Sequence, residues 1–234
     1  MTNLSDAPDD LMQPHPGFLI VGLGASAGGV EALRDFFAQV PADSGVAYVV
    51  ILHMSPEYES QLANVLQSVT PLTVMQVTET VRVVPNRVYV VSPKQHLTMV
   101  DGELTVSANT LPEERRAPID IFFRTLADTH HNRAVCVVLS GTGADGSMGL
   151  KRVKERGGVV FVQNPREAAF NEMPRSAIAT DLVDDVLPVA AMPARIMAYQ
   201  ASLGTIAIPV EADQRPEEQQ QALREIFTQL RVRT

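Results

Sequence analysis

The chain has 234 residues, of which 45% are hydrophobic, and its 19 basic and 27 acidic residues give a net charge of −8. This length suits one large domain with tails, and the acidic balance disfavours nucleic acid or an anionic membrane as the main partner. The single cysteine, Cys136, excludes an internal disulfide and a cysteine metal cluster, and it indicates a reducing compartment.

The first 16 residues are polar and contain several aspartates and three prolines. They lack the basic and apolar regions of a signal peptide, and no stretch of about 18 apolar residues follows anywhere in the chain. We therefore expect a disordered tail over residues 1–16 and a cytoplasmic protein.

Short apolar runs then alternate with segments of helical spacing. Strands are predicted over 18–22, 46–52, 74–77, 88–91, 134–139 and 159–162, and helices after residue 29, over 62–69, from Pro118 and after Asp145. Runs without polar alternation are typical of strands buried on both faces. The pair Asp101-Gly102 between two apolar runs predicts one antiparallel hairpin with a type I′ turn. The fold class predicted is α/β, with a doubly wound, mostly parallel sheet flanked by helices.

The end of the chain differs in composition. Residues 211–221 are polar and charged, after which Leu223, Ile226, Phe227 and Leu230 form an apolar stripe at helical spacing. We expect the main domain to span residues 17–203, and residues 204–234 to form a linker and a C-terminal amphipathic helix.

Three polar side chains follow three predicted strands: Ser26, His53 and Asp145. Functional groups of open α/β sheets gather at the carboxyl ends of the strands, so these three can converge. Together they would carry out nucleophilic acyl transfer. His53 would remove the proton from Ser26, the alkoxide would attack an ester carbonyl, and Asp145 would orient and stabilise the imidazole.

The remaining parts of such a centre are oxyanion donors and substrate contacts. Backbone amides near the helix start or in the glycine-rich loop 141–143 could bind the oxyanion. The candidates are Ala27, Thr142 and Gly143, together with Met54 beside the histidine.

Each candidate also has a simpler interpretation: Ser26 as a helix N-cap, Asp145 as a turn or cap residue, and His53 as the end of a strand. Only their joint placement favours catalysis. The pattern Gly22-x-Gly24 after a strand also matches a relaxed dinucleotide-binding fingerprint. That fingerprint expects an acidic residue after the second strand, where this chain has His53.

The other histidines give no metal prediction. His96 precedes the hairpin and is interpreted as a loop residue, while His130 and His131 end a helix, where the dipole favours cations. Because these side chains lack partners at ligand spacing, we expect no metal site.

Several motifs in order resemble the chemotaxis protein-glutamate methylesterases of the CheB type. Residues 24–29 are similar to the nucleophile loop of that family, residues 52–54 to its histidine motif, and residues 140–146 to its aspartate loop. Segments 89–96, 116–120 and 169–178 are similar to further family segments, so the likeness covers about residues 18–200.

The resemblance implies a catalytic domain over residues 17–203 that hydrolyses glutamate γ-methyl esters, and often deamidates glutamines, on the cytoplasmic helices of methylated chemoreceptors. It also implies that no cofactor is needed. The roles that it carries over are Ser26 as nucleophile, His53 as base and Asp145 as the orienting acid.

The chain departs from the family pattern in three ways. Ala27 stands where the family commonly has a hydroxyl residue, and Thr142 where it often has methionine. Only about 17 residues precede the first predicted strand, so we do not expect a phosphorylated receiver domain within this chain. The ending 222–230 is similar to the connection that leads, in some fused chemotaxis proteins, to a receptor methyltransferase domain. A receptor-binding or regulatory module without turnover is the alternative to an enzyme.

Overall fold

A parallel sheet forms the centre of the computed structural model, which describes residues 17–53, 61–91, 95–108, 117–205, 222–223, 226–230 and 232. Within these residues, seven strands pair in the order β10-β9-β8-β1-β2-β5-β3, and every pair is parallel. Three more form a small antiparallel sheet in the order β4-β7-β6. The predicted fold class is confirmed.

The strands of the large sheet are β1 (Ile20–Ala25), β2 (Ala47–Leu52), β3 (Thr73–Val77), β5 (Arg87–Val91), β8 (Ala134–Val138), β9 (Val159–Gln163) and β10 (Asp185–Leu187). Those of the small sheet are β4 (Val81–Arg82), β6 (Gln95–Val100) and β7 (Glu103–Ala108). The helices are α1 (Gly29–Phe37), α2 (Leu62–Gln67), α3 (Pro118–His130), α4 (Leu150–Glu155), α5 (Glu172–Ile178) and α6 (Met192–Thr205). The short strands β4 and β10 were not predicted from the sequence.

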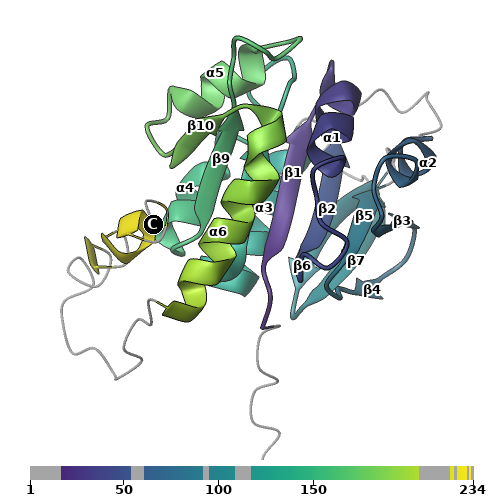
Figure 1. The fold of residues 1–234 in the computed structure, drawn as a ribbon, viewed down its shortest axis with the longest axis horizontal. Coiled ribbons are helices and arrows are strands. Elements are labelled where there is room, and N and C mark those ends of the chain that lie inside the picture. Colours follow the sequence, from purple (N-terminus) through teal and green to yellow (C-terminus); the bar gives the residue numbers. More distant parts are fainter. Residues whose placement is uncertain are drawn as a thin grey trace, which may run out of the picture.

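Helices cover both faces of the sheet, with α1 and α6 in front of it and α3 and α4 behind it in Figure 1. One core contains side chains of α1, α2 and α6, such as Phe36 and Tyr199. The other contains side chains of α3, α4 and α5, such as Phe122 and Leu150. Since central strands contribute alternate residues to both cores, they appear in the sequence as uninterrupted apolar runs.

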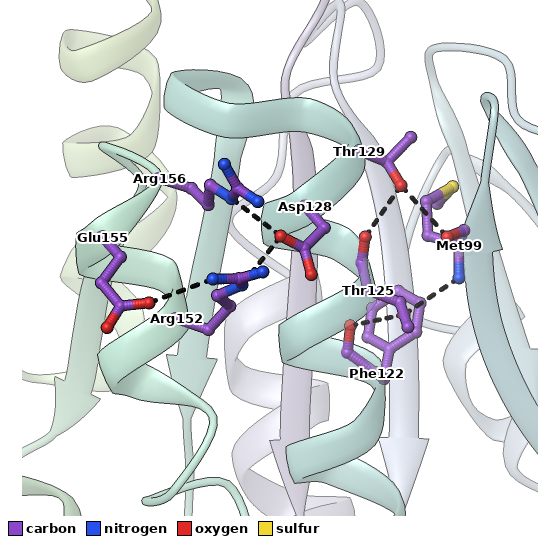
Figure 2. A network of polar contacts seen from close by, with 8 residues as sticks. All are labelled: Met99, Phe122, Thr125, Asp128, Thr129, Arg152, Glu155 and Arg156. Carbon is purple, nitrogen blue, oxygen red and sulfur yellow. Dashed lines mark hydrogen bonds and ion pairs between the residues drawn. The ribbon is translucent and has the colours of Figure 1, made fainter.

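The predicted hairpin is present as β6 and β7. Its turn residues Asp101 and Gly102 have φ angles of 48° and 80°, both positive, as a type I′ turn requires. The hairpin is fastened to α3 at Met99. Thr125 Oγ1 accepts a hydrogen bond from the Met99 N–H at 3.1 Å, and Thr129 Oγ1 donates to the Met99 carbonyl at 3.1 Å (Figure 2).

The first strand ends later than the sequence indicated. The prediction ended it at Gly22, but β1 continues through Gly24 to Ala25. A Cβ atom on Gly22 would lie 3.0 Å from Phe122 Cε1, and one on Gly24 would collide with Ile119. The two glycines therefore let α3 pack closely on β1, which is a reason for glycine inside a strand.

The described part of the chain end contacts the rest of the protein. Residues 226–230 are helical, and Thr228 and Val232 are buried, with Val232 in the core that contains α1 and α6. Ile226 and Leu230 of the predicted apolar stripe are exposed. The predicted tail 1–16 and residues 206–221 of the predicted linker lie outside the described residues. No helix in the described part is long and apolar enough to span a membrane.

Candidate functional site

Three strand ends bring the predicted residues to one edge of the sheet. Ser26 directly follows β1 and His53 directly follows β2, and the two strands pair with Ala25 opposite Leu52. On the other side of β1, the chain leaving β8 stays paired with it, because the Ser26 N–H donates to the Ser140 carbonyl at 2.9 Å. The loop that follows Ser140 leads to Asp145.

The three residues meet at this edge, but their hydrogen bonds do not form a complete relay. His53 Nδ1 lies 3.7 Å from Asp145 Oδ2, which is an ion-pair distance and longer than a hydrogen bond. The Ser26 hydroxyl donates to the main-chain carbonyl of His53 at 3.0 Å, not to the ring. The structure thus joins serine to histidine through the histidine backbone, and the Ser26 hydroxyl has to leave this carbonyl before its proton can reach the imidazole.

Asp145 is fixed by the start of a helix that precedes it in the sequence. The N-cap residue of α3, Ala117, makes no capping hydrogen bond, and Pro118 has no N–H. Instead, Asp145 Oδ2 accepts the Ile119 N–H at 3.2 Å, and its Oδ1 accepts the Asp120 N–H at 3.0 Å. Asp145 therefore caps α3 from 25 residues away, where the helix dipole favours a negative charge.

The pKa values of the pair follow from their burial. The Asp145 side chain is 5% exposed, and burial raises its pKa to about 6, with the negative charge of Asp120 adding to the rise and the amide hydrogen bonds opposing it. The His53 side chain is 37% exposed, and burial lowers its pKa below the usual 6.5. At pH 7 the imidazole is mainly neutral and the carboxylate mainly ionised, which are the states that a general base and its orienting acid need.

The loop that carries Ser26 is held by Ser140, whose role the sequence did not reveal. Ser140 Oγ donates to the Ala27 carbonyl at 2.9 Å and accepts the Phe170 N–H at 3.0 Å. Gln163, at the end of β9, accepts the Ser140 N–H at 2.8 Å. Polar residues at the ends of β8 and β9 were the only signal of this network in the sequence.

Glycine at position 141 allows the two loops to meet. A Cβ atom there would lie 2.9 Å from Ser26 Cβ and would collide with Met173. The spacing between the nucleophile loop and the aspartate loop thus depends on the absence of a side chain at Gly141.

The oxyanion candidates differ in whether their amides are already engaged. The Gly143 N–H donates to Glu172 Oε2 at 2.9 Å, so this candidate is occupied by a side chain that the sequence did not single out. Among the described residues, no hydrogen bond engages the N–H groups of Ala27 and Thr142. Ala27 is half-buried and Thr142 is exposed. The fourth candidate, Met54, lies outside the described residues.

Two alternative interpretations of the nucleophile loop do not agree with the structure. Helix α1 begins at Gly29, with Gly28 as its N-cap residue, so Ser26 is not a helix cap. Gly22 and Gly24 lie inside β1, whereas a dinucleotide-binding loop needs its glycines in the turn after the strand. The close packing of α3 accounts for these glycines instead.

Comparisons with known proteins agree with this geometry. A family model described as CheB methylesterase matches residues 21–196. The crystal structure of the Thermotoga maritima CheB methylesterase catalytic domain is similar with a TM-score of 0.71 and 28% sequence identity, covering 77% of this chain and 97% of that one.

Curated relatives are similar at about the same level. One from Burkholderia pseudomallei, named protein-glutamate methylesterase/protein-glutamine glutaminase 1, is 33% identical over 189 residues, which are 79% of this chain and 52% of that protein. One from Leptospira interrogans, named putative protein-glutamate methylesterase/protein-glutamine glutaminase, is 31% identical over 166 residues, 70% of this chain and 86% of that protein. The chain thus spans about half the length of the Burkholderia relative.

Proposed function

The chain belongs to the CheB methylesterase family, and we propose that it hydrolyses glutamate γ-methyl esters on the cytoplasmic helices of chemoreceptors. The names of the relatives supply this reaction, and they add glutamine deamidation as a second reaction at the same centre. The observation that carries the proposal is the 3.7 Å contact between His53 and Asp145, at the strand edge where the Ser26 hydroxyl is bonded to the His53 backbone.

The chemistry starts from a neutral imidazole. After the Ser26 hydroxyl turns from the His53 carbonyl to the ring, His53 takes its proton and the alkoxide attacks the ester carbonyl. Asp145 stabilises the resulting imidazolium. The amides of Ala27 and Thr142 are the proposed donors to the oxyanion, since no hydrogen bond among the described residues engages them.

Collapse of the tetrahedral intermediate breaks the ester bond. The methoxide takes the proton from His53 and leaves as methanol, and the glutamyl group stays on Ser26 as an ester. A water molecule, deprotonated by the same imidazole, then attacks this ester. The products are a glutamate carboxyl group and the regenerated Ser26 hydroxyl, so one water is consumed for each methanol released.

Methanol release from a methylated receptor tests the proposal. We expect Ser26→Ala to lower the rate by at least about 10³-fold and to abolish labelling by a serine-directed phosphonate. The matched control is Ser68→Ala, which removes an exposed hydroxyl that bonds to Val65 at the end of α2. If Ser26→Ala kept its turnover and its labelling, the serine mechanism would be rejected.

A receptor-binding or regulatory module is the second candidate. The observation that favours it is the Ser26 hydroxyl bonded to the main chain and not to the ring, together with alanine at position 27. This candidate predicts receptor binding with no methanol release from any methylated receptor. Turnover by the unmodified chain would exclude it.

The proposal also covers the organisation of the chain. We assign the activity to residues 17–203 in the cytoplasm, where the receptor helices lie, and the family match ending at residue 196 supports a boundary near 203. Residues 204–234 would lead to further domains, such as a receptor methyltransferase. Sequencing the gene beyond codon 234 tests this part directly.

A further inference from the structure

Beside the candidate site, two aspartates cap the starts of α3 and α4 reciprocally. Asp145, from the loop before α4, accepts the first free amides of α3. In return, Asp120, from the first turn of α3, accepts the Gly149 N–H with its Oδ1 at 2.6 Å, directly before α4 begins. The amides of Met148 and Gly146 also act to lower the pKa of the Asp120 carboxyl. Asp145 thus caps α3, the helix that contains Asp120, and Asp120 caps α4, the helix that follows Asp145.

This reciprocal capping fixes the path of the loop over residues 145–149. Gly146 has a φ of 94°, and a Cβ atom there would lie 2.9 Å from Ile119 Cγ2, so the loop lies directly against the first turn of α3. Asp120 is 6% exposed, so its hydrogen bonds are protected from water. Loss of this acceptor would leave the Gly149 N–H without its buried partner, which favours a shift of the loop.

We propose that Asp120 is a positioning residue of the esterase reaction: by binding the Gly149 N–H at the end of the loop that follows Asp145, it holds Asp145 in the place from which its carboxylate reaches His53. This inference rests on the proposed function. Asp120 touches neither the substrate nor the reacting atoms, and it acts only through Asp145.

The charge of Asp120 gives this role a measurable signature. The groups that face it are Asp145 across the helix start, His53 beyond Asp145, and Arg124 one turn along α3, which acts to lower the pKa of Asp120. Burial is the main cause of the raised pKa of Asp145, and the negative charge of Asp120 adds to it. Removing that charge makes Asp145 easier to ionise and the His53 imidazolium less stable. Both changes move the acid limb of activity to lower pH.

The test uses the full chain with Asp120→Asn, which keeps one acceptor oxygen and nearly the same shape. We expect kcat for methanol release to fall about 10- to 100-fold, since small displacements of a reacting group cost this much. We also expect the acid limb of kcat/KM to move down by roughly 0.5 pH unit. Phosphonate labelling of Ser26 should persist.

Asp128→Asn is the matched control. Asp128 is also an aspartate of α3 and also contacts α4, so this variant removes a comparable charge away from the site. Asp128 lies about two turns further along α3 and bonds to arginines at the surface (Figure 2). This variant should keep the kcat and the pH profile of the unmodified chain. A wild-type kcat in Asp120→Asn, or a lower kcat with an unchanged pH profile, would overturn the positioning role.

An NMR titration of His53 separates this inference from the proposed function. If the unmodified chain released no methanol, the esterase proposal would fail. The His53 pKa would still decide the geometry: a lower value in Asp120→Asn than in Asp128→Asn supports the position assigned to Asp120, and equal values overturn it.

Discussion

The contact between α3 and α4 has two ends, and aspartates at these ends have opposite properties. At the site end, the Asp145 side chain is 5% exposed and Asp120 is 6% exposed, and both accept hydrogen bonds from backbone amides. At the far end, Asp128 is 40% exposed and lies 2.8 Å from Arg152 Nε and 2.7 Å from Arg156 Nε (Figure 2). The same helix pair is joined by hydrogen bonds from backbone amides to carboxylates at one end and by ion pairs at the other.

The pKa values of these aspartates shift in opposite directions at the two ends. Burial raises the pKa values of Asp120 and Asp145 above the usual value of a carboxyl group. At Asp128, burial is the largest single effect and acts in the same direction, but the hydrogen bonds and charges of Arg156 and Arg152 together outweigh it and lower the pKa. Opposite charges in water make a stable surface contact, whereas a buried carboxylate without a permanent cation can stabilise a charge that forms during a reaction.

The largest expected effect is the loss of the Asp145 charge. Asp145→Asn should lower kcat for methanol release by about 10⁴-fold, since the imidazolium loses its stabilising partner. Asp128→Asn should change kcat less than about twofold, because surface charges act weakly over this distance. Steady-state kinetics on both variants, with circular dichroism as a check of folding, measure the difference. A loss of less than tenfold in Asp145→Asn would show that the two ends are not functionally distinct.

A second prediction concerns how the site end of α3 is seated on the sheet. Gly24→Ala would push its new methyl group into Ile119, whose N–H binds Asp145. We expect the free energy of unfolding to fall by about 1–3 kcal/mol, as overpacking usually costs, and kcat to fall as well. Urea denaturation measures the first effect. Gly17→Ala is the control, because a Cβ atom there meets nothing within 4 Å. Unchanged stability in Gly24→Ala would mean that α3 does not need this close approach.

The sequence predicted the sheet edge well, because buried parallel strands leave a clear signal. Apolar runs before His53 and Ser140 fixed the ends of β2 and β8 closely, and the Asp101-Gly102 pair fixed the hairpin. The end of β1 was wrong, since glycine usually marks a turn, and only the contact with α3 explains why Gly22 and Gly24 lie inside a strand. Strand β10 has three residues and begins with an aspartate, so no periodicity could reveal it.

The surroundings of the candidate site could not be predicted for a related reason. Asp145 bonds to amides 25 and 26 residues before it, and the Ser140 hydroxyl bonds to Ala27 from 113 residues away. Such partners depend on how the helices cross the sheet, which a local pattern does not encode. The sequence therefore predicted that Ser26, His53 and Asp145 would meet at one edge of the sheet. It did not predict the bonds by which Asp120, Glu172 and Gln163 hold the neighbouring loops.

The smallest expected effect tests the far end alone. Arg156→Ala removes one of the two arginines bound to Asp128, and Arg156 is 39% exposed, so solvent screens the pair. We expect the free energy of unfolding to fall by about 0.5–1 kcal/mol in low salt, less in 1 M salt, with kcat unchanged. Urea denaturation at both salt concentrations measures this, and Lys151→Ala, a weaker contact of the same helix at 4.0 Å from Glu155, is the control. The loop that contains Asp145 leads directly into α4. A fall in kcat in Arg156→Ala would therefore mean that loss of the ion pair at one end of α4 alters the site at the other end. The two ends of the contact between α3 and α4 would then not be functionally separate.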